Sequence, residues 1–182
     1  MVYVFLADGF EEVEALTPID VLRRAGVEVC TVGITGKTVT SSHGVPMVAD
    51  LMPEQTNLDA AELIFLPGGM PGTKNLFASD FVRNAVQAFV DSSRYVSAIC
   101  AAPSIVLGGM GILKGKRATC YPGMEDGMTG AIAQDLPCVW DGKIITGRGA
   151  GAAFEFALTL CEALCGRETA DKIAASMCYV RG

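Results

Sequence analysis

Residues 1–32 read MVYVFLADGFEEVEALTPIDVLRRAGVEVCTV and contain one complete β-α-β unit. The apolar run 2–6 has the length of a strand. Residues 11–25 are predicted to be helical, because acidic side chains fill the first turn and Gly26 lies just past the end. A second apolar run follows at 27–32. Strands that are apolar at successive positions indicate a parallel sheet covered on both faces.

The same alternation continues along the chain. It predicts strands at 63–66 and 96–99, helices at 80–92, 101–107, 152–165 and 168–176, and a hairpin excursion within 37–49. Segments 138–140 and 143–146 are predicted to pair around the turn Asp141-Gly142. The whole predicts an α/β fold, a three-layer flavodoxin-like sandwich with a mainly parallel central sheet. With no linker or repeat in the sequence, residues 1–182 are expected to form a single domain.

Composition excludes several classes of function. The chain has 14 Lys and Arg against 20 Asp and Glu, a net charge of −6, which argues against a nucleic-acid binder or a polybasic membrane anchor. Residues 95–113 carry no charge, but Pro103 and three glycines favour a buried strand, turn and helix over a membrane span. The chain opens on a strand-like run and not on a basic leader.

The cysteines and the single histidine limit the metal and redox chemistry. The seven cysteines form no CxxC and no disulfide pattern, and with one His they predict no metal site and no cofactor. A reducing cytoplasm is the expected location. His43 falls in the excursion and is interpreted as a turn residue. Most of the cysteines are interpreted as core or uninformative positions.

Cys100 is different, because it follows a predicted strand directly and precedes a predicted helix. In Ser97-Ala-Ile-Cys-Ala-Ala102, small residues flank the thiol, as in the tight turn of a nucleophile elbow. At a helix N-terminus the pKa of a thiol is expected to fall from about 8.5 to a value of about 3.5–7.5. The sequence therefore predicts a nucleophilic thiolate here. The alternative is a buried core cysteine.

Two other segments end predicted strands at the same edge of the sheet. Leu66-Pro-Gly-Gly69 can direct backbone N–H groups at one point, as an oxyanion hole requires, or can be an ordinary strand-to-helix turn. Glu11 and Glu12 suit the positive end of the first helix. Glu14 lies one turn further in among apolar residues, where burial would raise its pKa and leave a proton donor for a thiolate.

The stretch Gly147-Arg-Gly-Ala-Gly-Ala152 fits a loose dinucleotide fingerprint. No strand with an acidic end follows it, so a tight turn that packs a helix on the sheet is the competing interpretation. A nucleotide-binding module is retained as a third hypothesis on this stretch.

Together these segments resemble the DJ-1/ThiJ/PfpI superfamily, and its DJ-1/ThiJ branch most. The resemblance covers essentially the whole chain. It rests on Ala7-Asp-Gly-Phe-Glu-Glu-Val-Glu14, Pro18-Ile-Asp-Val-Leu-Arg-Arg-Ala-Gly26, Leu66-Pro-Gly-Gly69, Asn75-Leu76, Ala98-Ile-Cys-Ala-Ala-Pro103, Thr146-Gly-Arg-Gly149 and Phe154-Glu-Phe156.

The resemblance implies a flavodoxin-like homodimer with a reactive Cys100 and a protonated Glu14. Gly68, Gly69 and the Ala101 amide would form the anion pocket, and Tyr121, Asp20 and Arg24 are accessory candidates. Members of the superfamily act as cofactor-free glyoxalases on small 2-oxoaldehydes and as redox-responsive proteins whose Cys becomes a sulfinate. Deglycase and chaperone activities and an older thiazole monophosphate biosynthesis label are also attached to them. The partners it implies are therefore small electrophilic carbonyl compounds.

Two departures from the family pattern bear on activity. A His often lies in a Thr-x-His-Pro stretch near the cysteine, whereas this chain has Ala118-Thr-Cys-Tyr-Pro122, with Tyr121 in that place. Protease-type members have His directly after the nucleophile, where Ala101 stands here. The absence of a Cys-His pair argues against a peptidase. Without that histidine, Glu14 would have to transfer the protons in a glyoxalase reaction. The alternative is a stress-protective protein that oxidises at Cys100 without dedicated turnover.

Overall fold

The computed structural model describes residues 1–180 and has the predicted α/β architecture. The strands are β1 (Val2–Leu6), β2 (Val29–Gly33), β3 (Thr38–Thr40), β4 (Pro46–Val48), β5 (Leu63–Leu66), β6 (Tyr95–Ile99), β7 (Arg117–Ala118), β8 (Ile132–Ala133), β9 (Cys138–Asp141) and β10 (Ile144–Gly147). The α-helices are α1 (Glu12–Arg24), α2 (Gly72–Ala78), α3 (Asp80–Asp91), α4 (Ala153–Cys165) and α5 (Arg167–Ser176). Shorter helical turns are η1 (Pro53–Gln55), η2 (Leu58–Ala60), η3 (Pro103–Gly108), η4 (Glu125–Gly127) and η5 (Ala150–Ala152).

Six of these strands form the central sheet, in the order β2-β1-β5-β6-β10-β9. All neighbours pair in parallel except β9, which is antiparallel to β10 at one edge. The predicted hairpin around Asp141-Gly142 is therefore confirmed. The excursion also contains a hairpin, in which β3 pairs with β4.

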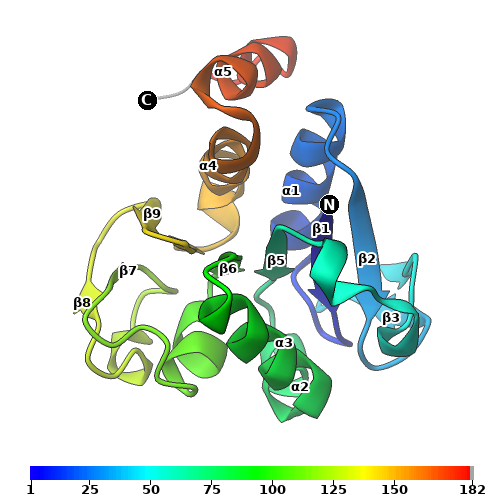
Figure 1. Ribbon diagram of the computed structural model, residues 1–182, viewed down its shortest axis with the longest axis vertical. Helices are drawn as coiled ribbons and strands as arrows, with labels where there is room; N and C mark the ends of the chain where they lie inside the picture. Colours follow the sequence, from blue (N-terminus) through cyan, green and yellow to red (C-terminus); the bar gives the residue numbers. More distant parts are fainter. Residues whose placement is uncertain (181–182) are drawn as a thin grey trace.

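Helices cover both faces of the sheet (Figure 1), and the sequence of β1 shows why. Tyr3 and Phe5 point into a core shared with α2, α3 and η3. Val2, Val4 and Leu6 point into a second core shared with α1, α4 and α5. A strand that is apolar at every position thus serves two separate cores, as a doubly covered parallel sheet requires.

Three local features differ from the prediction or were absent from it. Residues 101–107 do not form a regular α-helix, because η3 is a six-residue π-helical turn that begins only at Pro103. Helix α2 was missed, because its seven residues bury few side chains and give no periodic pattern. The two-residue strands β7 and β8 were missed for the same reason. Within residues 1–180, no helix combines the length and the apolar character needed to cross a membrane.

Candidate active site

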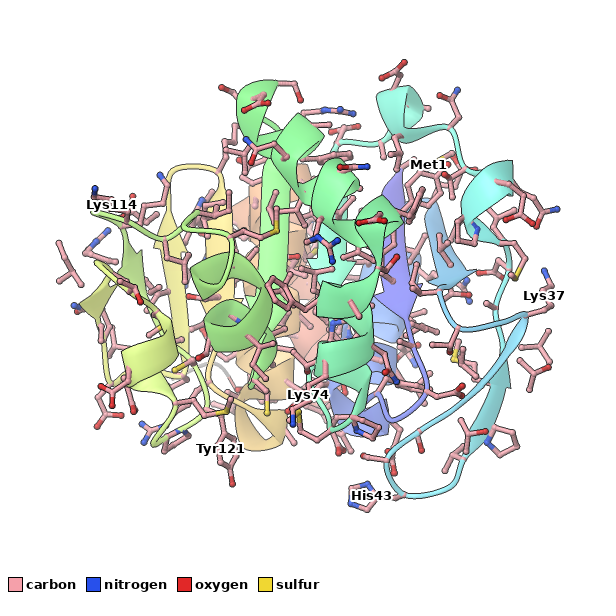
Figure 2. All side chains as sticks on the ribbon, turned by 90° about the horizontal axis from the view of Figure 1, so that it is seen from below. Met1, Lys37, His43, Lys74, Lys114 and Tyr121 are labelled. Carbon is pink, nitrogen blue, oxygen red and sulfur yellow. The ribbon has the colours of Figure 1, made fainter. Side chains whose placement is uncertain are left out.

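The site lies at the carboxyl-terminal end of the parallel strands of the sheet. Strands β1, β5, β6 and β10 are neighbours in the sheet, so the residues that follow them meet at one edge. In Figure 2 this edge carries His43, Lys74 and Tyr121, opposite the edge at which Met1 begins β1. Cys100 follows β6, and the glycines Gly68 and Gly69 follow β5.

Cys100 has a strained backbone conformation. Its φ of 64° lies in the left-handed region, which a residue with a Cβ seldom adopts. Its N–H donates to the Gly147 carbonyl at 2.9 Å, and its carbonyl accepts from the Tyr121 N–H at 2.8 Å. The main chain is thereby fixed on both sides at a sharp turn after a strand, the arrangement of a nucleophile elbow.

The Glu14 carboxyl group lies against Cys100. The residue is 1% exposed, and its Oε2 accepts the Gly68 N–H at 3.0 Å. The Ala150 N–H and the Cys100 thiol also donate to this carboxylate. Burial raises the pKa of Glu14 to about 7, and the charge of Glu11 acts in the same direction. The predicted rise in this pKa is therefore confirmed.

The predicted fall in the pKa of Cys100 is wrong. Burial, followed by the charge of the Glu14 carboxylate and its hydrogen bond, raises the pKa of the thiol to about 12. The N–H groups of Ala101 and Gly69 favour the thiolate, but they are outweighed. The helical turn after Cys100 is also too short to supply a strong dipole. At neutral pH the Cys100 thiol therefore keeps its hydrogen, whereas Glu14 is close to its own pKa and is present in both the protonated and the ionised form.

The glycines after β5 let the backbone approach both side chains. A Cβ on Gly68 would lie 2.4 Å from Glu14 Oε2 and 2.5 Å from Cys100 Cβ. The N–H of Gly68 donates to the Glu14 carboxyl group, whereas the N–H groups of Gly69 and Ala101 face the sulfur of Cys100. Of the three predicted anion-pocket donors, two therefore point at the nucleophile and one holds the acid.

The loop that links β10 to α4 belongs to the site, which the sequence did not reveal. The Ala150 N–H contacts Glu14, and a Cβ built on Gly149 would lie 4.0 Å from Glu14 Oε1. The same Cβ would lie 3.6 Å from Cδ2 of Tyr121. The only signal was the Gly-rich stretch 147–152, interpreted as a packing turn or a nucleotide fingerprint.

The accessory candidates lie in different places. Tyr121 is brought to the site, where its backbone N–H is hydrogen-bonded to the Cys100 carbonyl and the residue is 52% exposed. Arg24 and Asp20 pair with each other, Nε to Oδ2, at 2.9 Å on the exposed side of α1. Along α1, six residues separate Asp20 from Glu14 and ten separate Arg24 from it, about 9 Å and about 15 Å along the axis, and both side chains are exposed. Within one chain the structure therefore does not bring Asp20 or Arg24 to Cys100.

A group able to hold a metal ion lies beside the site. Among residues 1–180, the donor atoms of Glu11, Glu12 and His43 lie within 4.8 Å of one another. His43 Nδ1 is 3.0 Å from Glu12 Oε1 and 3.4 Å from Glu11 Oε2, and the hydrogen bond to Glu12 raises the pKa of His43. The sequence does not predict this cluster, because Glu11 and Glu12 lie far from His43 along the chain. An ion pair between the His43 imidazolium and the two carboxylates accounts for it.

Comparison with known proteins finds related sequences that cover most of this chain. The sequence profile described as the DJ-1/PfpI family matches residues 1–163. "Protein DJ-1 homolog A" of Arabidopsis thaliana is 39% identical over 176 residues, which are 95% of this chain but only 45% of that protein. "Glutathione-independent glyoxalase DJR-1.2" of Caenorhabditis elegans is 32% identical, over 94% of this chain and 91% of that protein.

A solved structure extends the comparison to three dimensions. The structure described as "Toxoplasma gondii DJ-1, oxidized" superposes with a TM-score of 0.95 at 35% identity. The match covers 99% of this chain and 98% of the other. The mixed α/β fold with its mostly parallel sheet is therefore shared with that protein over its length.

Proposed function

We propose, because the chain belongs to the DJ-1/PfpI family, that Cys100 and Glu14 convert small 2-oxoaldehydes into 2-hydroxy acids without glutathione or another cofactor. The relative named as a glutathione-independent glyoxalase supports the substrate class. The observation that carries the proposal is the hydrogen bond between the thiol of Cys100 and the buried carboxylate of Glu14.

The pair can begin the reaction from its resting state. Glu14 takes the thiol proton as the sulfur attacks the aldehyde carbon, and a C–S bond forms. The developing alkoxide lies within reach of the Gly69 and Ala101 N–H groups and takes the proton back, giving a hemithioacetal. A base whose pKa is about 7 suits this transfer at neutral pH, because it both accepts and returns protons readily.

The remaining steps need water and no external oxidant. Glu14 removes the proton from the former aldehyde carbon and delivers a proton to the neighbouring carbon, while the hydroxyl proton on the first carbon passes to the oxygen of the second. The first carbon is thereby oxidised to a thioester and the second reduced to an alcohol. Water then cleaves the C–S bond, which releases the 2-hydroxy acid and restores the thiol. The overall reaction adds one water molecule to the 2-oxoaldehyde.

The test is lactate formation from methylglyoxal in the absence of glutathione. Cys100→Ala should abolish turnover, and Glu14→Gln should lower it about 100-fold, the usual scale for loss of a general base. Cys178→Ala, at an exposed cysteine, and Glu54→Gln, at an exposed carboxylate, are the matched controls and should leave the rate unchanged. In the parent, kcat/KM should rise as the pH passes through about 7. Lactate formation that survives Cys100→Ala would refute the proposal.

A second candidate function is oxidation of Cys100 in a stress response, which the related structure described as oxidized favours. In this reaction a peroxide transfers oxygen to the sulfur, giving a sulfenic acid and water, and a second equivalent gives the sulfinate. The Gly69 and Ala101 N–H groups face the sulfur and can bind the added oxygens. Peroxide titration with peptide mapping should find modification concentrated at Cys100, and equal modification of all seven cysteines would refute this role.

Three further properties remain our proposals. We propose that residues 1–182 act as one domain, that the chain forms a homodimer, and that it acts in the cytoplasm. Exposed Val13 and Leu16 on α1, at 48% and 43%, support a partner surface, and sedimentation at micromolar concentration tests it. Cys30, Cys100, Cys165 and the exposed Cys178 form no disulfide, which supports a reducing compartment, and imaging of a tagged chain tests it.

A further inference from the structure

A cavity of about 440 Å³ is lined by residues that contact the Cys100–Glu14 pair. Three of its lining residues touch the pair or approach it. Tyr121 donates its N–H to the Cys100 carbonyl, Ala150 donates its N–H to the Glu14 carboxylate, and a Cβ on Gly149 would lie 4.0 Å from Glu14 Oε1. Cys100 and Glu14 are not among the lining residues, but the cavity begins at the residues that contact them, so it is the nearest space for the substituent of a carbonyl carbon bound to the sulfur.

The chemistry of the walls is apolar and aromatic. The cavity is lined by Tyr121, Pro122, Pro137, Arg148 and residues 149–152. Residues 149–152 are glycine and alanine, and they leave the space open. In Figure 2 the Tyr121 side chain projects from this edge of the molecule, where the ring can stack against a flat group.

The cavity offers no free positive charge to an anionic group. Arg148 is the charged residue among those that line it, and its guanidinium is bound to the carboxylate of Asp135. A substituent that carries a carboxylate or phosphate would have to compete with Asp135 for this side chain. A neutral substituent can enter the cavity without breaking the ion pair between Arg148 and Asp135.

The volume also exceeds what the smallest substrate needs. Cavities of about 300–1,000 Å³ accommodate ligands of drug size. Methylglyoxal, whose substituent is one methyl group, would leave most of this cavity to water. From the contacts, the walls and the volume together, we propose that the cavity between Tyr121 and the loop 147–152 binds the substituent of the substrate, and that the preferred 2-oxoaldehydes carry a neutral aromatic or bulky apolar group.

This inference rests on the proposed function, and the experiment separates the two. The parent protein should convert phenylglyoxal with a kcat/KM at least about tenfold above that for methylglyoxal, because the ring buries more apolar surface. Gly151→Leu places a side chain where an added Cβ meets nothing within 4 Å, and Tyr121→Ala removes the aromatic wall. Each variant should lower the phenylglyoxal to methylglyoxal ratio about tenfold. Ala175→Leu, on an exposed position of α5, is the control and should leave both rates unchanged.

A binding measurement tests the cavity independently of turnover. Acetophenone has the ring without the aldehyde, and NMR titration of the parent should show saturable shifts at Tyr121 and Gly151 that are lost in Gly151→Leu. If acetophenone binds but neither aldehyde is converted, the proposed function fails and the cavity assignment stands. If the aldehydes are converted without preference, if neither variant lowers the ratio, or if acetophenone does not bind, the inference is wrong.

Discussion

Replacing Glu14 by glutamine should change how the stability of the protein depends on pH. The folded structure raises the pKa of this carboxyl group from 4.5 to about 7, because the side chain is buried. Each tenfold change in proton affinity corresponds to about 1.36 kcal/mol, so the burial of a charged Glu14 costs about 3 kcal/mol. This free-energy cost comes from the Glu14 carboxyl group alone, so a single substitution at Glu14 removes it.

The direction of the pH dependence of stability follows from the proton that Glu14 holds in the folded state. Between pH 4.5 and about 7 the folded protein keeps a proton that the unfolded chain has lost. The contribution of Glu14 to stability is fully present below pH 4.5, and it is lost as the pH rises through about 7. Glutamine has no such proton. The free energy of unfolding of Glu14→Gln minus that of the parent should therefore increase by about 2.5 kcal/mol from pH 5 to pH 8.5.

Urea denaturation of both proteins across this range measures the difference. Titrating groups that do not interact with Glu14 cancel between them, and a constant offset from the new amide does not affect the trend. The slope m should be equal in the two proteins, which shows that the compared states are the same. Glu54→Gln, at an exposed residue, serves as the control. A difference that stays constant with pH, or that falls, would refute the assignment of Glu14 as a buried carboxyl group with a raised pKa.

Three other predictions follow from single contacts. Gly68→Ala places a Cβ 2.4 Å from the carboxylate oxygen of the site, so kcat/KM for methylglyoxal should fall at least about tenfold with unchanged circular dichroism, and near-parental activity would contradict the described geometry. His43 should titrate above 6.5 by NMR, and Glu12→Gln should lower its midpoint; an unchanged midpoint would show that the ion pair does not form in solution. Phe156→Ala removes a fully buried ring and should cost about 3–5 kcal/mol of unfolding free energy in urea, whereas a loss below about 1 kcal/mol would mean that this core is loosely packed.

Much of the fold could be predicted because the decisive signals are local. Continuous apolar runs identified β1, β5 and β6 as strands covered on both faces, and the small residues around Cys100 identified the sharp turn. Helix α2 and the strands β7 and β8 left no local signal, since they are too short to show periodicity. Their positions depend on packing between distant segments.

The candidate site was predictable in its members and not in its electrostatics. The position of Glu14 among apolar residues indicated an inward carboxyl group, which the structure has. The pKa of Cys100 could not be predicted, because it depends on how deeply the thiol lies and on the charge of Glu14 beside it. The roles of Ala150 and Gly149 depend on a contact between residues more than a hundred positions apart.

The loop between β10 and α4 couples two properties that an enzyme designer would wish to adjust separately. Its amide at Ala150 helps to set the acidity of Glu14, and its small residues form one wall of the neighbouring cavity. A substitution that reshapes the wall by moving the loop backbone also moves that amide. In variants of this loop, a change in the range of aldehydes converted should therefore be accompanied by a change in the pH optimum.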